Sequence, residues 1–482
     1  MQVEFSIMTK NYQKILREVY KKIEPTASER KKLEKLSRKT LAIANKFAKK
    51  IDGKAIVAGS LIRDTWLTKK KEFDIFIIFP RSIPEKKLEN LGLKFGKNII
   101  KQLGGTYKIE YAQHPYTRGI VNGIQIDIVP CYEIKTGERI KSAVDRTPLH
   151  VEYLNEHMTK NFSDDVRLLK QLCVANKIYG ADAKTQGFSG YVCELLIIKY
   201  GEIFNVLKNV VKWKAGEIID IENYYTKKDY PRLRKNFKEE VLIIIDPTDK
   251  RRNAAAAISA NSFFMLKKMA NVFLKDPSDE VFFEEKIESL TEDELIRLQM
   301  KRRTELLIVK FKPPKVVPDI LWPQLRRFAD RLENILKESE FEVLRKDIYT
   351  NEKDLATVLF EMQVSKLPTV DKRIGPSVFD LDDSERFLNK YKKISTAGPF
   401  IEKNYWCVEV NRNFTTARDK LLDSLEEREM VLKAKGIPNH IAEEIAKKFE
   451  IISGTDKIMD LVKKDENFGV FLRRHFMKTS LV

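Results

Sequence analysis

The sequence predicts a multidomain protein that combines α/β and α+β architecture. Its 482 residues exceed the size of a usual single domain, which is about 100–200 residues. Helix-like and strand-like segments alternate at the beginning, amphipathic helices follow, and a strand–helix–strand–strand order begins near residue 305. We therefore expect four regions, with approximate bounds at residues 1–145, 146–275, 276–412 and 413–482.

The first region is predicted to be an α/β domain. Residues 1–52 carry apolar side chains at three- and four-residue spacing, which indicates amphipathic helices. The run "PEKKLENLGLKFGKNIIKQL" predicts a further helix. Apolar runs rich in β-branched and aromatic residues predict strands at "KAIVAGS", "FDIFIIFP", "KIEYA" and "IQIDIVP". Such alternation of helices and strands is typical of an α/β domain.

The second region is predicted to be largely helical. The segments "DDVRLLKQLCVANKIYG" and "GYVCELLIIKYGEIFNVLKNV" favour amphipathic helices, with Gly180 and Gly201 as their expected ends. One strand is expected at "VLIIID", which ends at Pro247. Helical spacing returns in "NSFFMLKKMANVFLK", and it occurs again at the start of the third region in "TEDELIRLQMKRR".

The third region is predicted to be a ferredoxin- or RRM-like α+β domain. The strand "ELLIVKF" is followed by the helix "QLRRFADRLENILKES" and by the alternating strands "FEVLRKDIYT" and "DLATVLFEM". We expect the strand "NYWCVEVNR" to close this domain. From residue 416 onward the fourth region has helical spacing, so a helical C-terminal segment is expected.

The chain is strongly basic, with a formal net charge of +19. Lys and Arg are spread along the whole chain and not gathered in one tail, so we expect a broad positive surface. Many phosphate contacts on such a surface add up, which favours a nucleic acid as partner. A charge that serves solubility or heat stability is the alternative, and charge alone does not separate the two.

The cysteine pattern and the apolar runs predict a protein of the reducing cytoplasm. Four cysteines lie in or beside apolar runs and form no CxxC pair, so buried free thiols are expected. No 18 consecutive apolar residues occur, so no membrane span is expected, and the N-terminal residues lack a signal-peptide apolar core. The oligomeric state is not readable from the sequence, and a homodimer is left open.

Three acidic residues of the first region are spaced to share one face of a sheet. Glu72 and Asp74 lie two residues apart at the start of a predicted strand, so their side chains project to the same side. Neighbouring carboxylates repel each other unless a cation lies between them, and carboxylate oxygens suit Mg²⁺. Asp127 lies in an otherwise apolar strand, where an unpartnered carboxylate is costly. If the two strands are neighbours, the three carboxylates can hold two metal ions.

A Gly59-Ser60 turn precedes this acid pair, and Glu72 follows Ser60 by twelve residues. Taken singly, such a turn is usually an ordinary loop and an acid pair is usually solvated strand-edge charge. For Asp127 the two interpretations are balanced. The combination favours a site in which one metal activates a 3′-hydroxyl and the other holds a triphosphate.

Glycine-serine followed by acid-x-acid and a third acid resembles the signature of the polymerase-β-like nucleotidyltransferases. Further strings resemble the archaeal, class I CCA-adding enzymes of that superfamily. They are "GSLIRDTWL", "YAQHPY", "IDIVPCY", "IKSAVDRTPLH", "VRLLKQL" with "NKIYGAD", "GFSGYVCELL", "DPTDKRRNAAAAIS" and "GPFIEKNYWCVEV". They extend over residues 59–410, so the resemblance covers most of the chain. Glu72 departs from the superfamily pattern, which has Asp there, although archaeal members accept Glu.

The resemblance implies template-independent addition of C, C and A to the 3′ end of immature tRNA from CTP and ATP, with release of pyrophosphate. It implies a polymerase-β-like catalytic domain, a helical central domain that binds nucleotide, an α+β RNA-binding domain and a helical tRNA-contacting segment. Two Mg²⁺ ions are the implied cofactors. Glu72 and Asp74 would ligate both ions, and Asp127 would bind the catalytic ion near the primer 3′-hydroxyl.

The resemblance also implies a nucleotide-binding set of residues. Its members are the triphosphate contacts Ser60, Arg63, Lys170 and Tyr179, the sugar and phosphate contacts Thr147 and His150, the base-selecting Arg252 with its support Asn253, and His114 on the pocket wall.

Two other functions stay open at the level of sequence. One is a related RNA nucleotidyltransferase of the poly(A) type, or one acting on a small molecule. A CCA-adding enzyme differs from a poly(A)-type polymerase in stopping after A. The other is a non-catalytic RNA-binding relative, which would be expected to have lost part of the carboxylate set that is complete here.

Overall fold

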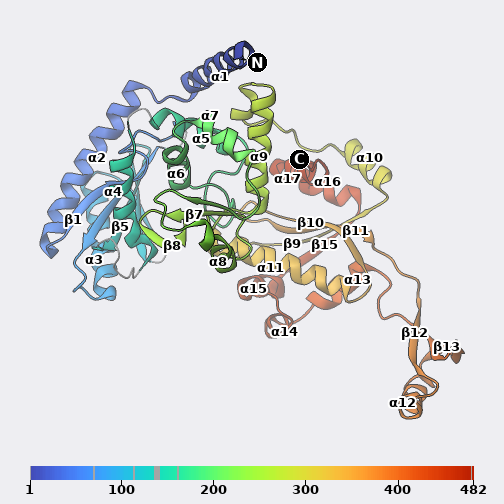
Figure 1. The fold of residues 1–482 in the computed structure, drawn as a ribbon. Coiled ribbons are helices and arrows are strands. Elements are labelled where there is room, and N and C mark those ends of the chain that lie inside the picture. The colour runs from blue at the N-terminus through green and yellow to red at the C-terminus, as the bar shows by residue number, and fades with distance from the viewer. Residues whose placement is uncertain are drawn as a thin grey trace. The chain divides into compact units, whose positions relative to one another are not determined.

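The computed structural model describes residues 2–68, 71–111, 114–134, 142–159, 162–478 and 480–481. Ala112, Gln113, Ile140 and Lys141 of the matching strings therefore lie outside the described residues. The chain folds into two compact units, Met1–Glu285 with Ser480–Val482 and Lys286–Thr479 (Figure 1). No described helix is both long enough and apolar enough to cross a membrane.

The first unit begins with two long helices and a five-stranded sheet. The helices are α1 (Gln2–Ile23) and α2 (Ala27–Ala48), and Thr26 caps α2 in a capping box with Glu29. The sheet has the order β1-β2-β5-β4-β3, and its strands are β1 (Lys54–Ala58), β2 (Glu72–Phe79), β3 (Thr106–Tyr111), β4 (Pro115–Val121) and β5 (Ile124–Tyr132). The predicted α/β domain is confirmed, although the sequence pattern did not indicate β4.

Alternation along β2 and β5 sorts their side chains between two faces of the sheet. One face packs against α2 and α3 (Glu85–Gln102), which cover it in Figure 1, and includes Phe73, Ile75, Ile77, Ile126 and Ile128. The opposite face includes Phe76, Ile78, Val129 and Cys131, packed with Val151 of α4 (Thr147–His157). Glu72, Asp74 and Asp127 fall on this second face by their period of two.

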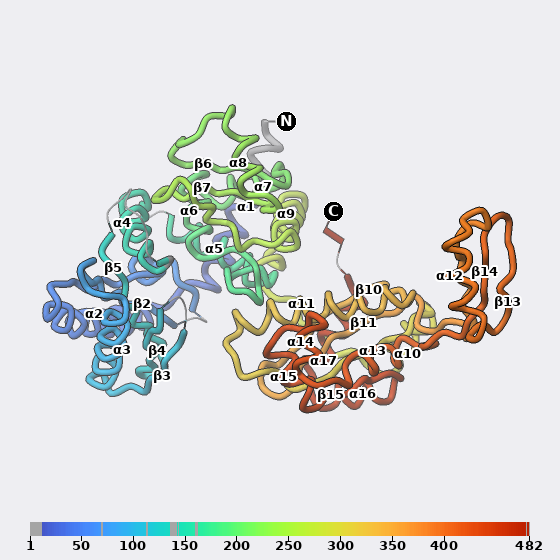
Figure 2. Tube along the Cα trace, turned by 90° about the horizontal axis from the view of Figure 1, so that it is seen from below, coloured from blue at the N-terminus to red at the C-terminus, as the bar shows by residue number. Residues whose placement is uncertain are grey.

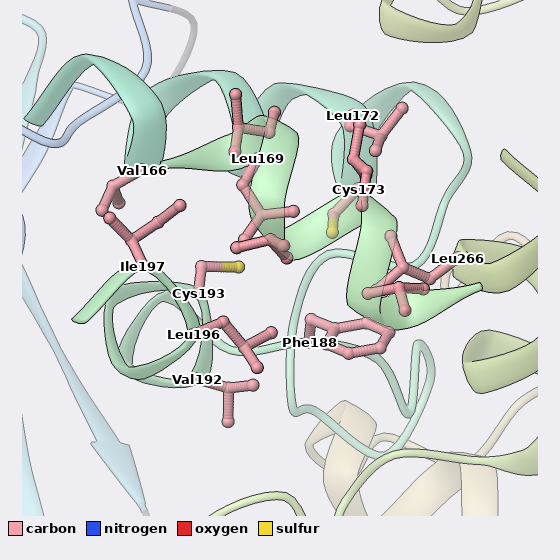
Figure 3. Packing of buried hydrophobic residues seen from close by; sticks show 14 of the residues in the cluster. Val166, Leu169, Leu172, Cys173, Phe188, Val192, Cys193, Leu196, Ile197 and Leu266 are labelled. Carbon is pink, nitrogen blue, oxygen red and sulfur yellow. The ribbon is translucent and has the colours of Figure 1, made fainter. Parts of the chain in front are cut away.

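A helical core with a small sheet completes the first unit. Its helices are α5 (Phe162–Ala175), α6 (Gly190–Tyr200), α7 (Ile203–Val210), α8 (Tyr230–Asn236) and α9 (Ala260–Lys275). Apolar side chains from α5, α6 and α9, among them Leu169, Leu196 and Leu266, pack together in one core (Figure 3). The small sheet has the order β6-β7-β8, with β6 (Glu217–Asp220), β7 (Leu242–Asp246) and β8 (Asp249–Asn253), and only β7 was predicted.

The two glycines predicted to end helices differ in outcome. Gly201 ends α6 with φ +88°, as expected. Gly180 does not end α5, because that helix ends at Ala175. Lys177 takes the left-handed conformation with φ +58°, and the amide of Ile178 donates to the carbonyl of Cys173, which closes the helix earlier.

The second unit is built on an antiparallel sheet of order β10-β11-β9-β15. Its strands are β9 (Glu305–Phe311), β10 (Glu342–Thr350), β11 (Ala356–Val364) and β15 (Phe449–Ile452). With α11 (Pro318–Lys337) after the first strand and α15 (Asn439–Lys447) before the fourth, this is the βαββαβ order of a ferredoxin-like domain. The predicted ferredoxin-like domain is confirmed.

Helices cover both faces of this sheet. On one face lie α11, α13 (Ala417–Leu425), α14 (Glu429–Ala434) and α15, and on the other lie α10 (Glu292–Arg302), α16 (Thr455–Lys464) and α17 (Glu466–Phe476). The prediction that residues 416–482 are entirely helical was wrong at β15. Ile451 packs into the first core and Ile452 into the second, which a strand permits because its successive side chains point to opposite faces.

A separate three-stranded sheet, of order β12-β14-β13, lies in the middle of the second unit's sequence. It consists of β12 (Val370–Ser377), β13 (Ser395–Glu402) and β14 (Tyr405–Asn411), with α12 (Leu381–Tyr391) packed on it. Figure 2 shows it standing apart from the ferredoxin-like sheet. The strand expected to close the α+β domain is β14, and that prediction was wrong because β15 instead pairs with β9 at the sheet edge.

All four cysteines, Cys131, Cys173, Cys193 and Cys407, are buried and carry free thiols, as the sequence predicted.

Candidate active site

The predicted carboxylates lie on one face of the five-stranded sheet. Strands β2 and β5 are parallel neighbours, in which Asp74 pairs with Asp127 and Glu72 pairs with Gln125. Asp127 is buried, whereas Glu72 and Asp74 are half-buried. The structure thus brings together the two strands that the sequence argument required to be neighbours.

Arg118 binds Asp127 from β4, the strand that neighbours β5 on the side opposite β2. The two residues are paired in the β4–β5 ladder, and Arg118 donates from Nε to Oδ1 at 2.9 Å and from Nη2 to Oδ2 at 2.7 Å. A further donation from Nη2 to the hydroxyl of Tyr116, at 2.8 Å, fixes the guanidinium. These hydrogen bonds fix the orientation of the Asp127 carboxylate.

Negative charge accumulates at Asp74. Burial, the Asp127 carboxylate and the Glu72 carboxylate together raise the pKa of Asp74 to about 7, and Arg118 opposes the rise only in part. Gly59 lies beside this group with φ +82°, and a Cβ on it would lie 3.0 Å from Oδ2 of Asp74. Glycine at position 59 thus serves both the left-handed turn and access to the carboxylate.

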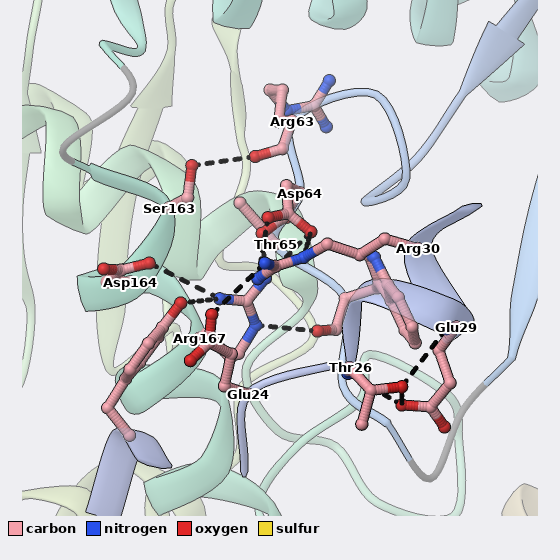
Figure 4. Close-up of polar contacts among 12 residues, drawn as sticks. Glu24, Thr26, Glu29, Arg30, Arg63, Asp64, Thr65, Ser163, Asp164 and Arg167 are labelled. Atoms are coloured by element: carbon pink, nitrogen blue, oxygen red, sulfur yellow. Dashed lines mark hydrogen bonds and ion pairs between the residues drawn. The ribbon is translucent and has the colours of Figure 1, made fainter. Parts of the chain in front are cut away.

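The loop that follows Gly59 is held by α5. Ser60 accepts at its carbonyl from the amide of Thr65 at 3.0 Å, which closes the loop on itself. Arg167 is fully buried and donates to the carbonyls of Asp64 and Trp66, and Ser163 donates to the carbonyl of Arg63 at 3.0 Å (Figure 4). These bonds position the backbone of the loop that carries Ser60 and Arg63.

Two predicted triphosphate contacts meet at one buried acid. Glu194 of α6 accepts from Nη2 of Arg63 at 3.0 Å and from Nζ of Lys170 at 3.3 Å. Thr65 adds a hydroxyl donation to Glu194 at 2.7 Å. Burial acts to raise the pKa of Glu194, but Lys170 and Arg63 outweigh it and hold the pKa below its ordinary value. The Glu194 carboxylate is therefore ionised.

Tyr179 lies close to the ammonium group of Lys170. A Cβ on Gly190, the first residue of α6, would lie 3.2 Å from the Tyr179 hydroxyl and 3.4 Å from Nζ of Lys170. Burial raises the pKa of Tyr179 well above its ordinary value, and the charges of Glu194 and Glu72 add to the rise. Tyr179 is therefore a neutral hydroxyl beside Lys170.

A second cluster surrounds Asp246 at the end of β7. The fully buried Asp246 carboxylate contacts Nε2 of His150 at 2.9 Å and accepts from Nη1 of Arg252 at 2.6 Å and from the Tyr191 hydroxyl at 3.1 Å. Burial acts to raise the pKa of Asp246, but His150, the Thr248 amide and Arg252 hold it well below its ordinary value. Because Tyr191 directly follows Gly190, the start of α6 joins this cluster to that of Lys170 and Tyr179.

The side chain of Asn253 binds backbone groups, and Thr147 begins a helix. Asn253 is buried, accepts from the amides of Ile244 and Ala255 at 2.8 Å and donates to the carbonyl of Leu242. Its side chain therefore fastens β8 to β7 and so supports the strand that carries Arg252. Thr147 is the first residue of α4, three residues before His150.

The contacts described for His114 are with α3. Its buried ring lies immediately before β4, with Nδ1 at 3.3 Å from Glu89 and 3.7 Å from Glu85, both on α3. These three residues place their potential metal-ligating atoms within 4.8 Å of one another. Among the described residues no such group includes Glu72, Asp74 and Asp127, so the strand carboxylates are more widely spaced in this structure.

Sequence reasoning missed four charged residues of the site, Arg118, Arg167, Glu194 and Asp246, and also the hydroxyl groups of Thr65 and Tyr191. Glu194 is a single acid in the apolar run "YVCELLII", the same signal that singled out Asp127, and Asp246 ends the apolar run "VLIIID". No local signal marks Arg118 or Arg167, because their partners come from other strands or loops.

The first unit carries carboxylates on two strands of its sheet, and it carries the cations Arg63 and Lys170 on separate elements. The carboxylates of β2 and β5 can hold hard cations, which prefer oxygen ligands. The buried Arg63 and Lys170 can bind phosphate oxygens by charge-assisted hydrogen bonds. Arg252, which is 34% exposed and anchored by Asp246, presents donors suited to the edge of a base.

Comparisons with protein families match three parts of the chain. Residues 16–150 match the nucleotidyltransferase domain, residues 164–283 the second domain of tRNA nucleotidyltransferase, and residues 302–454 the C-terminal domain of the CCA-adding enzyme. Among solved structures, the Cid1 poly(U) polymerase has a TM-score of 0.44 and 16% identity, over 57% of this chain and 99% of that chain.

Curated relatives are similar over nearly the whole sequence. The CCA-adding enzyme of Methanoregula boonei is 34% identical over 95% of this chain and 94% of its own length. The CCA-adding enzymes of Methanocaldococcus jannaschii and Methanococcus maripaludis are 37% and 38% identical, over 79% and 77% of this chain and 85% and 82% of their own lengths. The chain belongs to the family of CCA-adding enzymes.

Proposed function

We propose that this enzyme adds C, C and A, without a template, to the 3′ end of immature tRNA from CTP and ATP in the cytoplasm, and releases pyrophosphate. The observation that carries the proposal is the in-register pair of Asp74 and Asp127 on one sheet face, in a chain of this family. Nucleotidyl transfer needs such carboxylates next to a group of cations that binds the triphosphate, and Arg63 and Lys170 supply that group.

Glu72, Asp74 and Asp127 are the proposed ligands of two Mg²⁺ ions. The donor set fits a hard divalent cation because all its ligands are carboxylate oxygens, and because the raised pKa of Asp74 marks negative charge that a cation would relieve. When bound, the ions would activate the 3′-hydroxyl of the tRNA and neutralise the leaving pyrophosphate. Arg118 keeps Asp127 oriented, since it binds both carboxylate oxygens.

The triphosphate is proposed to bind Ser60, Arg63, Lys170 and Tyr179. Arg63 and Lys170 bring positive charge, and the neutral Tyr179 hydroxyl brings a hydrogen-bond donor. Thr147 and His150 on α4 are proposed contacts of the sugar and phosphates. The assignment of His114 to the nucleotide pocket has no support in its contacts with Glu85 and Glu89, and it rests on the resemblance alone.

Arg252 is proposed to read the incoming base together with the growing tRNA end. Asp246 binds one of its terminal nitrogens, which leaves the rest of the planar guanidinium for a base edge. Asn253 is proposed to support this role, because its side chain binds backbone groups of β7 and so holds the strand that carries Arg252.

The four sequence regions are proposed to divide the work. Residues 1–145 carry catalysis, residues 146–275 bind the nucleotide, and residues 276–412 and 413–482 contact the body of the tRNA. The last two regions share the cores of the ferredoxin-like sheet, so we expect them to act as one RNA-binding unit.

Primer extension tests the proposal directly. A tRNA transcript that lacks its last three nucleotides is incubated with the protein, Mg²⁺ and either CTP, ATP or both. We expect two additions with CTP alone, and one further A followed by a stop when both are present. Unlimited A addition would indicate a poly(A)-type polymerase, and tight binding without addition would indicate a non-catalytic RNA-binding protein.

A further inference from the structure

Glu194 joins the two cations assigned to the triphosphate. Glu194 is 2% exposed, and its carboxylate lies between the loop after β1, which carries Arg63, and α5, which carries Lys170. Thr65 links Glu194 to Lys170 a second time. Its hydroxyl donates to Glu194 at 2.7 Å and accepts from Nζ of Lys170 at 3.0 Å. One acid and one hydroxyl thus fix the relative positions of two cations from separate elements.

Arg63 keeps two donors unpaired although it is buried. Its side chain is 8% exposed, Nη2 donates to Glu194, and neither Nε nor Nη1 has a hydrogen-bond partner among the described residues. Buried donors without partners cost free energy, and folded proteins seldom retain them without a reason such as a ligand that completes them. Phosphate oxygens are the acceptors that a guanidinium binds best.

Arg167 shows what a purely structural arginine looks like in the same region. It is fully buried, and Nε, Nη1 and Nη2 all donate, to the carbonyl of Trp66, the hydroxyl of Tyr20 and the carbonyl of Asp64. In Figure 4 the guanidinium of Arg63 points away from these contacts. The difference between the two arginines indicates that Arg63 is held ready for a ligand.

We infer that Glu194 is a positioning residue for the triphosphate of both nucleotides. It holds Arg63 by one nitrogen and Lys170 by its ammonium, so that the remaining donors of Arg63 stay free and fixed for phosphate oxygens. Because CTP and ATP share the triphosphate, Glu194 acts on both alike and takes no part in choosing between C and A. This inference rests on the proposed function.

Steady-state kinetics of Glu194→Gln test the inference. The glutamine keeps the size of the side chain but loses the charge that holds both cations. We expect the KM values for CTP and for ATP to rise alike, by about tenfold, with the KM for tRNA unchanged and kcat lowered by less than about threefold. The inhibition constant of inorganic tripolyphosphate rises by the same factor. Glu194→Asp, which retains the charge, recovers part of the loss.

A matched control separates positioning from a general loss of stability. Asp165→Asn removes the charge of another carboxylate of the same helical core, one that accepts from the Ile203 amide at the start of α7 at 2.9 Å. We expect the nucleotide KM of this variant to stay at the wild-type value. If Glu194→Gln does not fold, Thr65→Val tests the same geometry, because it removes the hydroxyl that contacts both Glu194 and Lys170.

Three outcomes overturn the inference. One is an unchanged nucleotide KM in Glu194→Gln despite a lower melting temperature, which would leave Glu194 a structural role only. The second is a lower KM, which would make Glu194 a competitor of the phosphate. The third is a shift for one nucleotide alone. A failure of the proposed function gives a different result. In that case the wild-type protein itself does not extend the tRNA transcript.

Discussion

Asp74 and Asp127 are directly paired in the parallel ladder of β2 and β5, so their side chains project from the same face of the sheet. The negative charges of Asp127 and Glu72 disfavour the ionised form of Asp74, which burial disfavours as well. Arg118 compensates Asp127 alone, and the pKa of Asp74 stays raised to about 7. The pair is the chemical centre of the proposed site.

Asp74→Asn and Asp127→Asn should each abolish nucleotide addition. Asparagine keeps the shape but removes the charge that binds the metal, so we expect kcat to fall by at least about a thousandfold while tRNA affinity changes less than about twofold. Primer extension and a filter-binding assay measure the two quantities. Asp52→Asn is the control, because Asp52 has φ +51° and asparagine also accepts that conformation. Near-normal rates in both active-site variants would refute the metal-site assignment.

Gly59→Ala should inactivate the enzyme beyond any loss of stability. The new Cβ would lie 3.0 Å from Oδ2 of Asp74 in a backbone with φ +82°. Gly123→Ala is a matched control, since Gly123 has φ +76° but a Cβ there meets nothing within 4 Å. We expect both variants to lose about 1 kcal/mol of stability, measured by thermal melting, and only Gly59→Ala to lose primer extension. Equal activities in the two variants would contradict the access argument.

Arg252→Ala should relax the choice between C and A more than it slows addition. The guanidinium anchored to Asp246 is the proposed base reader, and its loss removes donors for a base edge. We expect discrimination between CTP and ATP, measured as the ratio of kcat/KM values at each position, to fall by about tenfold or more. Arg251→Ala removes the neighbouring arginine, which is 78% exposed, and should leave the ratio unchanged. An unchanged ratio in Arg252→Ala would exclude the reading role.

Glu294→Gln should destabilise the second unit at neutral pH more than at acid pH. The Thr291 amide, the Arg473 guanidinium and the Thr291 hydroxyl lower the pKa of Glu294 to about 2, against an ordinary value of 4.5. A lowered pKa stabilises the folded state above pH 4.5, and this contribution is lost as the pH falls from 4.5 toward 2. Since the side chain is 31% exposed, we expect only about 1–2 kcal/mol at pH 7.

The measurement is the melting temperature of the full chain at pH 7, 5 and 4, for the wild type and the variant. Glu292→Gln, in the same first turn of α10, is the control and should have little effect at any of these pH values. A difference between Glu294→Gln and the wild type that grows as the pH falls would contradict the assigned cause.

Sequence periodicity predicted most elements of the fold but not how the strands of the second unit combine. The pattern indicated β9, α11, β10 and β11, because each has long, regular apolar spacing. It did not reveal that the four residues of β15 complete their sheet while β14 belongs to another. Strands that pair although they are far apart in sequence leave no local signal of their pairing. A strand of only four residues between helices is also too short for its sequence pattern to be distinguished from that of a helix.

The sequence by itself predicted the chemistry of the proposed site and most of the elements that carry it. The spacing of Glu72 and Asp74, and the position of Asp127 in an apolar strand, predicted a shared sheet face because side chains alternate along a strand. Only the tertiary structure decided which charges meet. The partners Arg118 with Asp127, Glu194 with Arg63 and Lys170, and Asp246 with Arg252 mostly come from different strands, loops or helices. Burial of each acid makes such a partner necessary, and packing alone selects which residue provides it.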